Sequence, residues 1–459
     1  MAPFVDRPIT TLAGGEHLAR ERLSDGLGAR TIAGVYQRAA LASGRSAAEG
    51  ERRPFRALAA LYLDRATREP DDELARIRAA SGADPAEETG WMLEPDPVAR
   101  RRALAASIAR EDRESRWMRD RIELRERAAR DAGATSVVGL LDAAQPRASA
   151  AIAREFERDA IEPLDEAISA AARQRRQRFG LDPDENAASE TPAFLSMAAL
   201  AGRLPATAIH GVVRRVGTRF GEDPDSAGPH LAPRPAPGPR SFVGLTRDGL
   251  AVIVAGAVAG PGGLRDLLGS FGVAARAGRI ADLRGTAAVR FADPAFAHAS
   301  STLWRRLPLC PRFRREAGLD ADDWEIRELA FQEAVAMRLA WAYLQTAVTG
   351  IDGSSPAFDR IVRRSCGAAA TPAERRAVAD RDPSWSAQLR GNLLGLLLEQ
   401  RLRLRYGRDW FSRNEARRFL VEMWEAEPEM TAEEMAGSLD LGTIEATPMV
   451  DAFRDGVAG

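Results

Sequence analysis

The sequence predicts a mainly α-helical protein with one small β-hairpin or sheet near residues 241–256. Two observations carry this prediction. Long windows rich in Ala, Arg, Leu and Glu place their apolar residues at helical spacing. One stretch alone gives a convincing strand pattern, in which two β-branched runs flank a turn. No internal repeat of solenoid period is visible, which argues against a stacked array.

Three helices are expected in the first half of the chain. In the first, apolar residues fall among many Arg and Glu residues, which is typical of a helix with one buried face. The last ends near Gly180, a common C-terminal stop. The expected helices are residues 98–132, 136–144 and 148–178.

A connection rich in Pro and Gly, residues 221–239, interrupts the helical pattern and predicts an extended segment. Directly after it, residues 241–245 and 250–254 flank the turn Arg247-Asp-Gly and predict a hairpin. A helix is expected from Leu264, and helices are expected to fill the remainder. The predicted domains are an N-terminal helical lobe 1–221, a connection 222–240 and a C-terminal lobe 241–459.

The charged residues exclude several kinds of function. The chain of 459 residues contains no lysine, so all 65 basic residues are arginine. A P-loop, a Schiff-base enzyme and a protein kinase each require a lysine and are excluded. The 66 acidic residues bring the net charge to −1, which argues against nucleic acid or an anionic membrane as the main partner.

The two cysteines, Cys310 and Cys366, are too few for a disulfide framework or a Cys-based metal site. The N-terminal segment lacks the pattern of a secretory signal, and no apolar run is long enough to span a bilayer. We therefore expect a cytoplasmic protein. Arginine clusters at residues 173–178 and 401–418 could attract phosphates, but a solvated face paired with Glu and Asp is the favoured interpretation.

The order of these segments resembles the oligoendopeptidase F and thimet-oligopeptidase-like zinc peptidases. The segments that carry the resemblance begin at Glu162-Pro-Leu-Asp-Glu, His230-Leu-Ala-Pro-Arg-Pro, Gly238-Pro-Arg-Ser-Phe, Pro261-Gly-Gly-Leu-Arg-Asp-Leu-Leu, Asp382-Pro-Ser-Trp, Gln388 and Tyr406-Gly-Arg-Asp-Trp-Phe. The resemblance implies a large two-lobed helical body with a central channel, a bound zinc ion and an extended peptide as substrate. The C-terminal lobe would correspond to the catalytic half.

The motif of that family, H-E-x-x-H on a helix, is absent. Its two histidines share one helix face and bind zinc, while the glutamate polarises the attacking water. The resemblance places these positions at Gly269, Ser270 and Val273, which makes the motif degenerate. A rival alignment anchored on Phe296-Ala-His-Ala-Ser places them at residues 288–292 and supplies no ligand or base either.

Other residues form a possible vestigial site. Glu333 matches the family's third zinc ligand, and Gln388 is the best match for its oxyanion-stabilising tyrosine. His298 could join Glu333 at a metal, but two ligands make a weak site. The plainer interpretations are an arginine partner other than Arg338 for Glu333, and a hydrogen-bonding role for His298. We expect the arginines beside Cys366 to lower the pKa of its thiol.

The leading hypothesis is a pseudoenzyme: a metallopeptidase-like protein without zinc or catalytic residues that binds a peptide or protein partner in a helical channel. One alternative is an enzyme of another class that reuses the channel around Glu333, His298 or Cys366. Another is a weak zinc oligopeptidase with a metal site that the sequence does not reveal. The sequence leaves the oligomeric state open.

Overall fold

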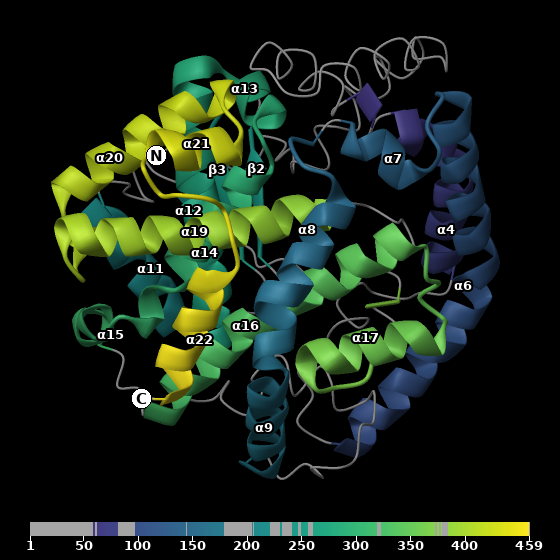
Figure 1. The fold of residues 1–459 in the computed structure, drawn as a ribbon, viewed down its shortest axis with the longest axis horizontal. Helices are drawn as coiled ribbons and strands as arrows, with labels where there is room; N and C mark the ends of the chain where they lie inside the picture. Colours follow the sequence, from purple (N-terminus) through teal and green to yellow (C-terminus); the bar gives the residue numbers. More distant parts are fainter. Residues whose placement is uncertain are drawn as a thin grey trace. The chain divides into compact units, whose positions relative to one another are not determined.

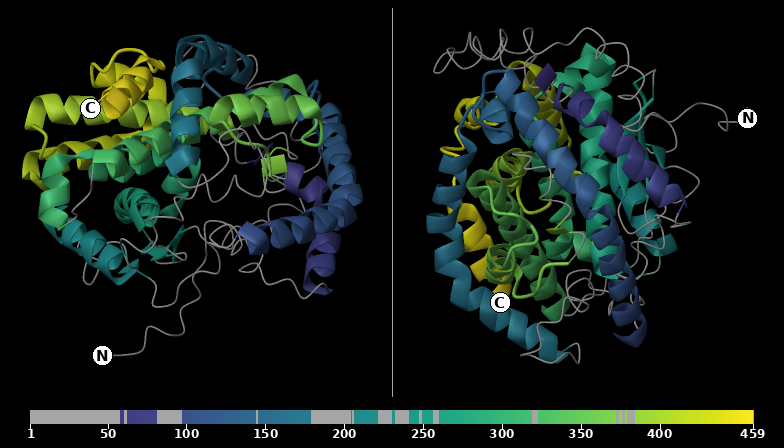
Figure 2. Two further views of the ribbon diagram at one scale, coloured as in Figure 1. Left: turned by 90° about the horizontal axis from the view of Figure 1, so that it is seen from below. Right: turned by 90° about the vertical axis from the view of Figure 1, so that its right-hand side faces the viewer.

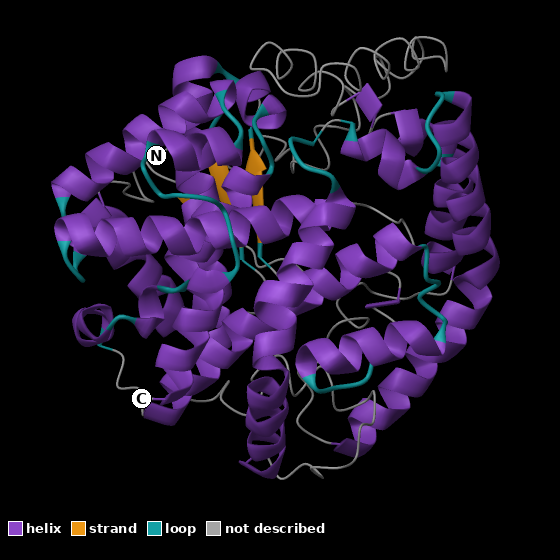
Figure 3. Ribbon diagram, viewed as in Figure 1, coloured by secondary structure: helices purple, strands orange, loops and turns teal. Residues whose placement is uncertain are grey.

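The computed structural model describes residues 58–80, 97–178, 204–220, 230–231, 241–318 and 323–458, apart from residues 60–61, 144, 205, 247–248, 256–259, 372–373, 376–377 and 379–383. These residues are mainly helical, with three short strands (Figure 1, Figure 3). The predicted fold class is therefore confirmed. Within the described part of the chain, no helix has the length and apolar character needed to cross a membrane.

The chain divides into two compact units, each built from segments that are distant in sequence. Among the described residues, unit 1 falls within Leu200–Leu329 and Arg390–Ile444, and unit 2 falls within Gly26–Ala199, Ala330–Leu389 and Glu445–Gly459. The boundaries fall inside two long helices, α16 (Asp323–Thr349) and α19 (Ser384–Tyr406). This division differs from the sequence-based one, which places its connection at residues 222–240.

Unit 2 contains the three helices expected in the first half of the chain. Its helices, besides parts of α16 and α19, are α4 (Arg68–Ala80), α6 (Pro97–Asp131), α7 (Val137–Asp142), α8 (Ser149–Phe156), α9 (Glu162–Arg178), α17 (Pro356–Cys366) and α22 (Thr447–Ala458). The long helix α6 packs along α4 (Figure 2). Tyr62 belongs to a buried apolar cluster that includes residues from the end of α6 and from α7. Its hydroxyl donates a hydrogen bond to the carbonyl of Ala128 at 3.2 Å.

The single helix expected over residues 148–178 contains a π-helical turn, Glu157–Ile161, between α8 and α9. Pro163 explains this turn, because a proline ring clashes with the carbonyl four residues earlier and provides no N–H for it. A wider turn before the proline relieves both problems. The carbonyls of Ala160 and Ile161 in this turn accept hydrogen bonds from Arg338 of α16.

Helix α17 shows how the sequence fixes a helix at both ends. Ser355 is the N-cap and its hydroxyl accepts from the N–H of Ala357, while Pro356 occupies the first turn. The helix stops at Gly367, which has a left-handed backbone with φ 73°. An ideal Cβ at Gly367 would lie 2.7 Å from the Cβ of Ala172, so glycine is required there.

Unit 1 contains a small sheet of order β1-β3-β2. The predicted hairpin is observed as β2 (Phe242–Leu245) and β3 (Ala251–Val254), which pair antiparallel with Val243 opposite Ile253. The strand β1 (His230–Leu231) pairs parallel to β3 and lies in the segment that the sequence analysis treats as a connection.

Helix α12 (Gly260–Arg284) packs against the sheet and forms its most extensive helix contact with α14. The other helices of unit 1 are α11 (Ala206–Phe220), α13 (Thr286–Phe291), α14 (Ala295–Arg305), α15 (Pro311–Ala317), α20 (Asn414–Ala426) and α21 (Ala432–Ser438). An aromatic core is built around Trp304, whose ring centroid lies 4.7 Å from that of Phe220 and 5.0 Å from that of Phe271. The degenerate motif therefore lies on the helix at the centre of unit 1.

Candidate functional site

The degenerate motif lies in the middle of α12. Gly269 is buried, whereas Ser270 and Val273 are partly exposed. None of the three side chains can coordinate zinc as histidine does or polarise water as glutamate does. The rival placement at residues 288–292 covers the end of the six-residue helix α13 and also carries no histidine or carboxylate.

The face of α12 that carries Gly269 is closed by α14. An ideal Cβ at Gly269 would lie 2.7 Å from the Oγ of Ser301 and 3.5 Å from the Cβ of Arg305. At Gly272 it would lie 2.2 Å from the Cδ1 of Trp304. The 2.7 Å and 2.2 Å separations are shorter than van der Waals contact, so a side chain at Gly269 would displace the Ser301 hydroxyl and one at Gly272 would displace the indole of Trp304.

His298 lies on α14 beside α19, where an ideal Cβ at Gly391 would be 2.6 Å from the Cβ of His298. Burial lowers the pKa of His298 to about 4, and Arg305 and Arg276 add to this effect while Asp293 opposes it. The imidazole is therefore neutral near pH 7. In the residues that the structure describes, no three His, Cys, Asp or Glu side chains are grouped as a metal site requires.

Glu333 and Gln388 belong to unit 2, whereas His298 and the degenerate motif belong to unit 1. Glu333 lies on α16 and is 2% exposed, and Gln388 lies on α19 and is partly exposed. Their assembly into one vestigial site stays a prediction. The guanidinium of Arg338, five residues along α16 from Glu333, pairs with Asp165.

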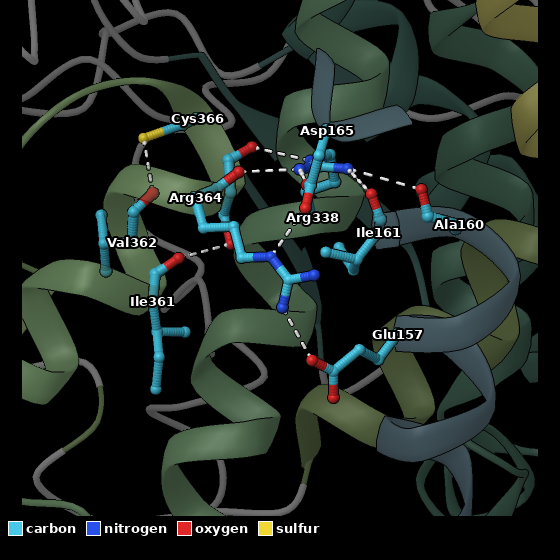
Figure 4. A network of polar contacts seen from close by, with 10 residues as sticks. Glu157, Ala160, Ile161, Asp165, Arg338, Ile361, Val362, Arg364 and Cys366 are labelled. Atoms are coloured by element: carbon cyan, nitrogen blue, oxygen red, sulfur yellow. Dashed lines mark hydrogen bonds and ion pairs between the residues drawn. The ribbon is translucent and has the colours of Figure 1, made fainter. Parts of the chain in front are cut away.

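Cys366 lies at the end of α17 (Figure 4). The thiol donates to the carbonyls of Val362 at 3.3 Å and Ala368 at 3.6 Å. The expectation of a lowered thiol pKa is wrong: burial raises the pKa of Cys366 to about 12 and outweighs the effects of Arg176 and Arg338. Such a thiol is protonated and does not act as a nucleophile near neutral pH.

The arginine cluster at residues 173–178 also differs from its expectation. Arg173 and Arg178 are exposed, as a solvated face requires. Arg175 and Arg176 are buried, however, so the expectation is wrong for them. Arg176 donates to the carbonyl of Gly367 at 2.8 Å, and the guanidinium of Arg175 lies 5.4 Å from the ring centroid of Phe331. These arginines pack within unit 2.

Sequence reasoning missed a group of buried ion pairs in unit 1. Arg390 is 1% exposed and pairs with Asp293 at 2.7 Å and with Glu433. Two further buried pairs join Arg276 to Glu427 and Arg306 to Glu399. No sequence signal distinguishes these arginines from the others among the 65. Their partners lie 43 to 151 residues away along the chain, so only the fold reveals them.

Comparison with solved structures identifies the fold. A PZ peptidase A crystallised with an inhibitor matches 90% of this chain and 79% of its own, with a TM-score of 0.59 and 12% identity. A Bacillus anthracis protein assigned as an oligoendopeptidase F matches 92% of this chain and 84% of its own, with a TM-score of 0.54 and 11% identity. A Pyrococcus furiosus carboxypeptidase matches 89% of this chain and 84% of its own, with a TM-score of 0.55 and 12% identity.

Neither protein-family models nor curated proteins yield a match to this sequence. At 11–12% identity the likeness to the solved structures shows the fold alone. The resemblance inferred from the order of the sequence segments is confirmed at this level. The chain has the fold of the oligoendopeptidase-like peptidases.

Proposed function

We propose that this protein is a catalytically inactive metallopeptidase-like protein that binds a peptide or protein partner. The observation that carries the proposal is the closed face of α12. Where the resemblance places the first zinc ligand, the chain has Gly269, and Ser301 of α14 lies in the space that a side chain there would enter. At this position the loss of the histidine is therefore accompanied by a close approach of α14.

Zinc, the metal that the resemblance implies, does not fit these residues. A catalytic zinc site supplies three protein ligands, an open position for water and a nearby base. Gly269, Ser270 and Val273 offer no imidazole and no carboxylate, and the neutral His298 is a single ligand. These residues therefore provide no site for metal-assisted hydrolysis.

The binding part of the proposal rests on the fold. The resemblance implies a channel for an extended peptide, and a chain that keeps such a scaffold while losing its chemistry is best suited to holding a peptide or a protein tail. The balanced net charge of −1 favours a polypeptide over nucleic acid as the partner. We place this role in the cytoplasm, where the free thiols of Cys310 and Cys366 are stable.

Metal content and peptide cleavage, measured together, test the proposal. The full chain is purified without chelator, its zinc is measured by mass spectrometry, and a quenched fluorescent peptide library reports cleavage. We expect substoichiometric zinc, no cleavage, and binding of labelled peptides from the same library by fluorescence anisotropy. His298→Ala is the control and should change none of these results. Stoichiometric zinc with cleavage that is lost in Glu333→Gln would overturn the proposal.

A further inference from the structure

We propose that the contact between α12 and α14 is a metal-independent structural joint, in which close helix packing fills the place that the resemblance assigns to the first zinc ligand and buried ion pairs hold the helices of unit 1 together. This inference goes beyond the proposed function, because it concerns what now stabilises unit 1. It also states that catalysis cannot be recovered by restoring the motif alone.

The first step is the packing on both sides of α14. Gly269 and Gly272 of α12 lie against one side, and Gly391 and Gly395 of α19 lie against another. At Gly395 an ideal Cβ would be 2.7 Å from the carbonyl oxygen of Ala299. Glycine allows helix backbones to approach this closely. A larger residue at Gly272, Gly391 or Gly395 would clash with the backbone of α14, whereas one at Gly269 would displace the Ser301 hydroxyl.

The second step is the anchoring of α14 at its start. Asp293 precedes the N-cap residue Pro294 and accepts from the N–H of Ala295, the first residue of α14, at 3.0 Å. The same carboxylate accepts from Arg390 at 2.7 Å and from the N–H of Ala432, the first residue of α21, at 3.2 Å. Asp293 therefore ties α14, α19 and α21 together while remaining fully buried.

The third step concerns the end of α14 and the neighbouring part of α12. Arg306 follows α14 and pairs with Glu399 of α19 at 2.5 Å. Arg276 of α12 pairs with Glu427, in the turn after α20. Removing one partner of the Asp293–Arg390 pair or of the Arg306–Glu399 pair leaves an uncompensated buried charge, so these contacts hold the helices in one arrangement.

A matched pair of glycine substitutions tests the packing. Gly272→Ala places a methyl group 2.2 Å from the Cδ1 of Trp304, whereas Gly437→Ala on α21 meets nothing within 4 Å. Alanine favours both helices intrinsically. We expect Gly272→Ala to lower Tm by about 5 °C and Gly437→Ala to leave it unchanged or raise it. Equal Tm values for the two variants would overturn the joint.

Restoring the motif tests the replacement of the metal. The triple variant Gly269→His/Ser270→Glu/Val273→His is expected to have a lower Tm than the wild-type chain and to retain no zinc after dialysis against zinc-free buffer. One equivalent of zinc at a wild-type Tm would overturn the joint, yet the proposed function of the wild-type chain would stand. If the triple variant does not fold, the wild-type chain decides: its Tm should be the same in EDTA and in zinc, and a drop in EDTA would overturn the joint.

Discussion

Gly269 and Gly272 are two positions of α12 without side chains, and the resemblance assigns the first of them to a zinc ligand. A glycine inside a helix is destabilising by itself, so its presence calls for a packing reason. Here the reason is α14, whose Ser301 and Trp304 lie where the side chains would be. The sequence alone shows the loss of the motif, but it does not show that a neighbouring helix fills the space.

Cys366 provides a direct prediction at the residue scale. Because burial raises the pKa of its thiol to about 12, we expect no reaction with a thiol reagent in the native protein near pH 8. The measurement uses Cys310→Ser, so that Cys366 is the only thiol, and follows labelling with and without urea. Labelling should require unfolding. Rapid labelling of the native variant would instead support an enzyme that uses this thiol.

Glu427 predicts a pH dependence of stability. Burial raises its pKa to about 7 from 4.5; Arg276 opposes this effect and Asp293 adds to it. The folded state therefore holds a proton that the unfolded state releases between these values. This contribution to the free energy of unfolding is fully present below pH 4.5 and is lost as the pH rises through about 7. The loss amounts to at most about 3 kcal/mol. Urea unfolding between about pH 5 and 8 measures it.

Glu427→Gln removes this titration and should flatten the fall in stability over that range. Glu429→Gln is the matched control, since this carboxylate lies in the same turn but is 66% exposed, and it should retain the wild-type profile. His298 acts in the opposite sense: its lowered pKa gives stability that is present above 6.5 and lost as the pH falls through about 4. The contribution of His298 is the same in each variant and in the wild type, so it cancels when their profiles are compared. An unchanged profile in Glu427→Gln would contradict the prediction.

At the scale of elements, the spacing of apolar residues in the sequence predicts most of the helices and the hairpin. The window 98–132 became α6, and the paired β-branched runs became β2 and β3, because both patterns depend on local spacing. The strand β1 was missed because two residues, His230 and Leu231, carry no periodicity and form a strand only by pairing with β3. The π-helical turn before Pro163 was missed for a related reason: a proline near a helix start is normally tolerated.

The carbonyls of that π-helical turn accept hydrogen bonds from a buried arginine, which gives the prediction at this scale. Arg338 of α16 is fully buried and donates to the carbonyls of Ile161 at 2.9 Å and Ser365 at 3.0 Å, and to Asp165 at 2.5 Å (Figure 4). One side chain thus connects α16 to the π-helical turn, to α9 and to the end of α17. Removing it leaves these carbonyls without their donor inside unit 2.

Arg338→Met is therefore expected to lower the free energy of unfolding by about 3–5 kcal/mol, measured in urea. Arg364→Met is the matched control. Its guanidinium also pairs with Asp165, but it is 36% exposed, so the expected loss is about 1 kcal/mol or less. Equal losses in the two variants would show that burial of Arg338 does not have this role.

At the scale of the whole molecule, the sequence predicted the fold class and the likeness to oligoendopeptidase-like peptidases, because the order of segments survives at low identity. It did not predict how distant segments combine into compact units. Unit 2 joins residues 97–178 to residues 330–366 through contacts such as Trp341 Nε1 to the carbonyl of Ala153 at 3.0 Å. Pairing between segments this far apart leaves no local pattern in the sequence.

The last prediction follows from this construction. Residues 1–221 and 241–459, the two predicted lobes, each contain only part of unit 2. Expressed separately, the first lacks Arg338 as partner of Asp165, and the second lacks the carbonyl of Ala153 as partner of Trp341. We expect neither fragment to unfold cooperatively in urea, because each exposes an apolar face and leaves buried polar groups unpaired. The full chain cleaved once at an engineered site within residues 222–240 is the control and should keep its cooperative transition. Cooperative unfolding of the isolated 1–221 fragment would show instead that the sequence-based lobes are the folding units.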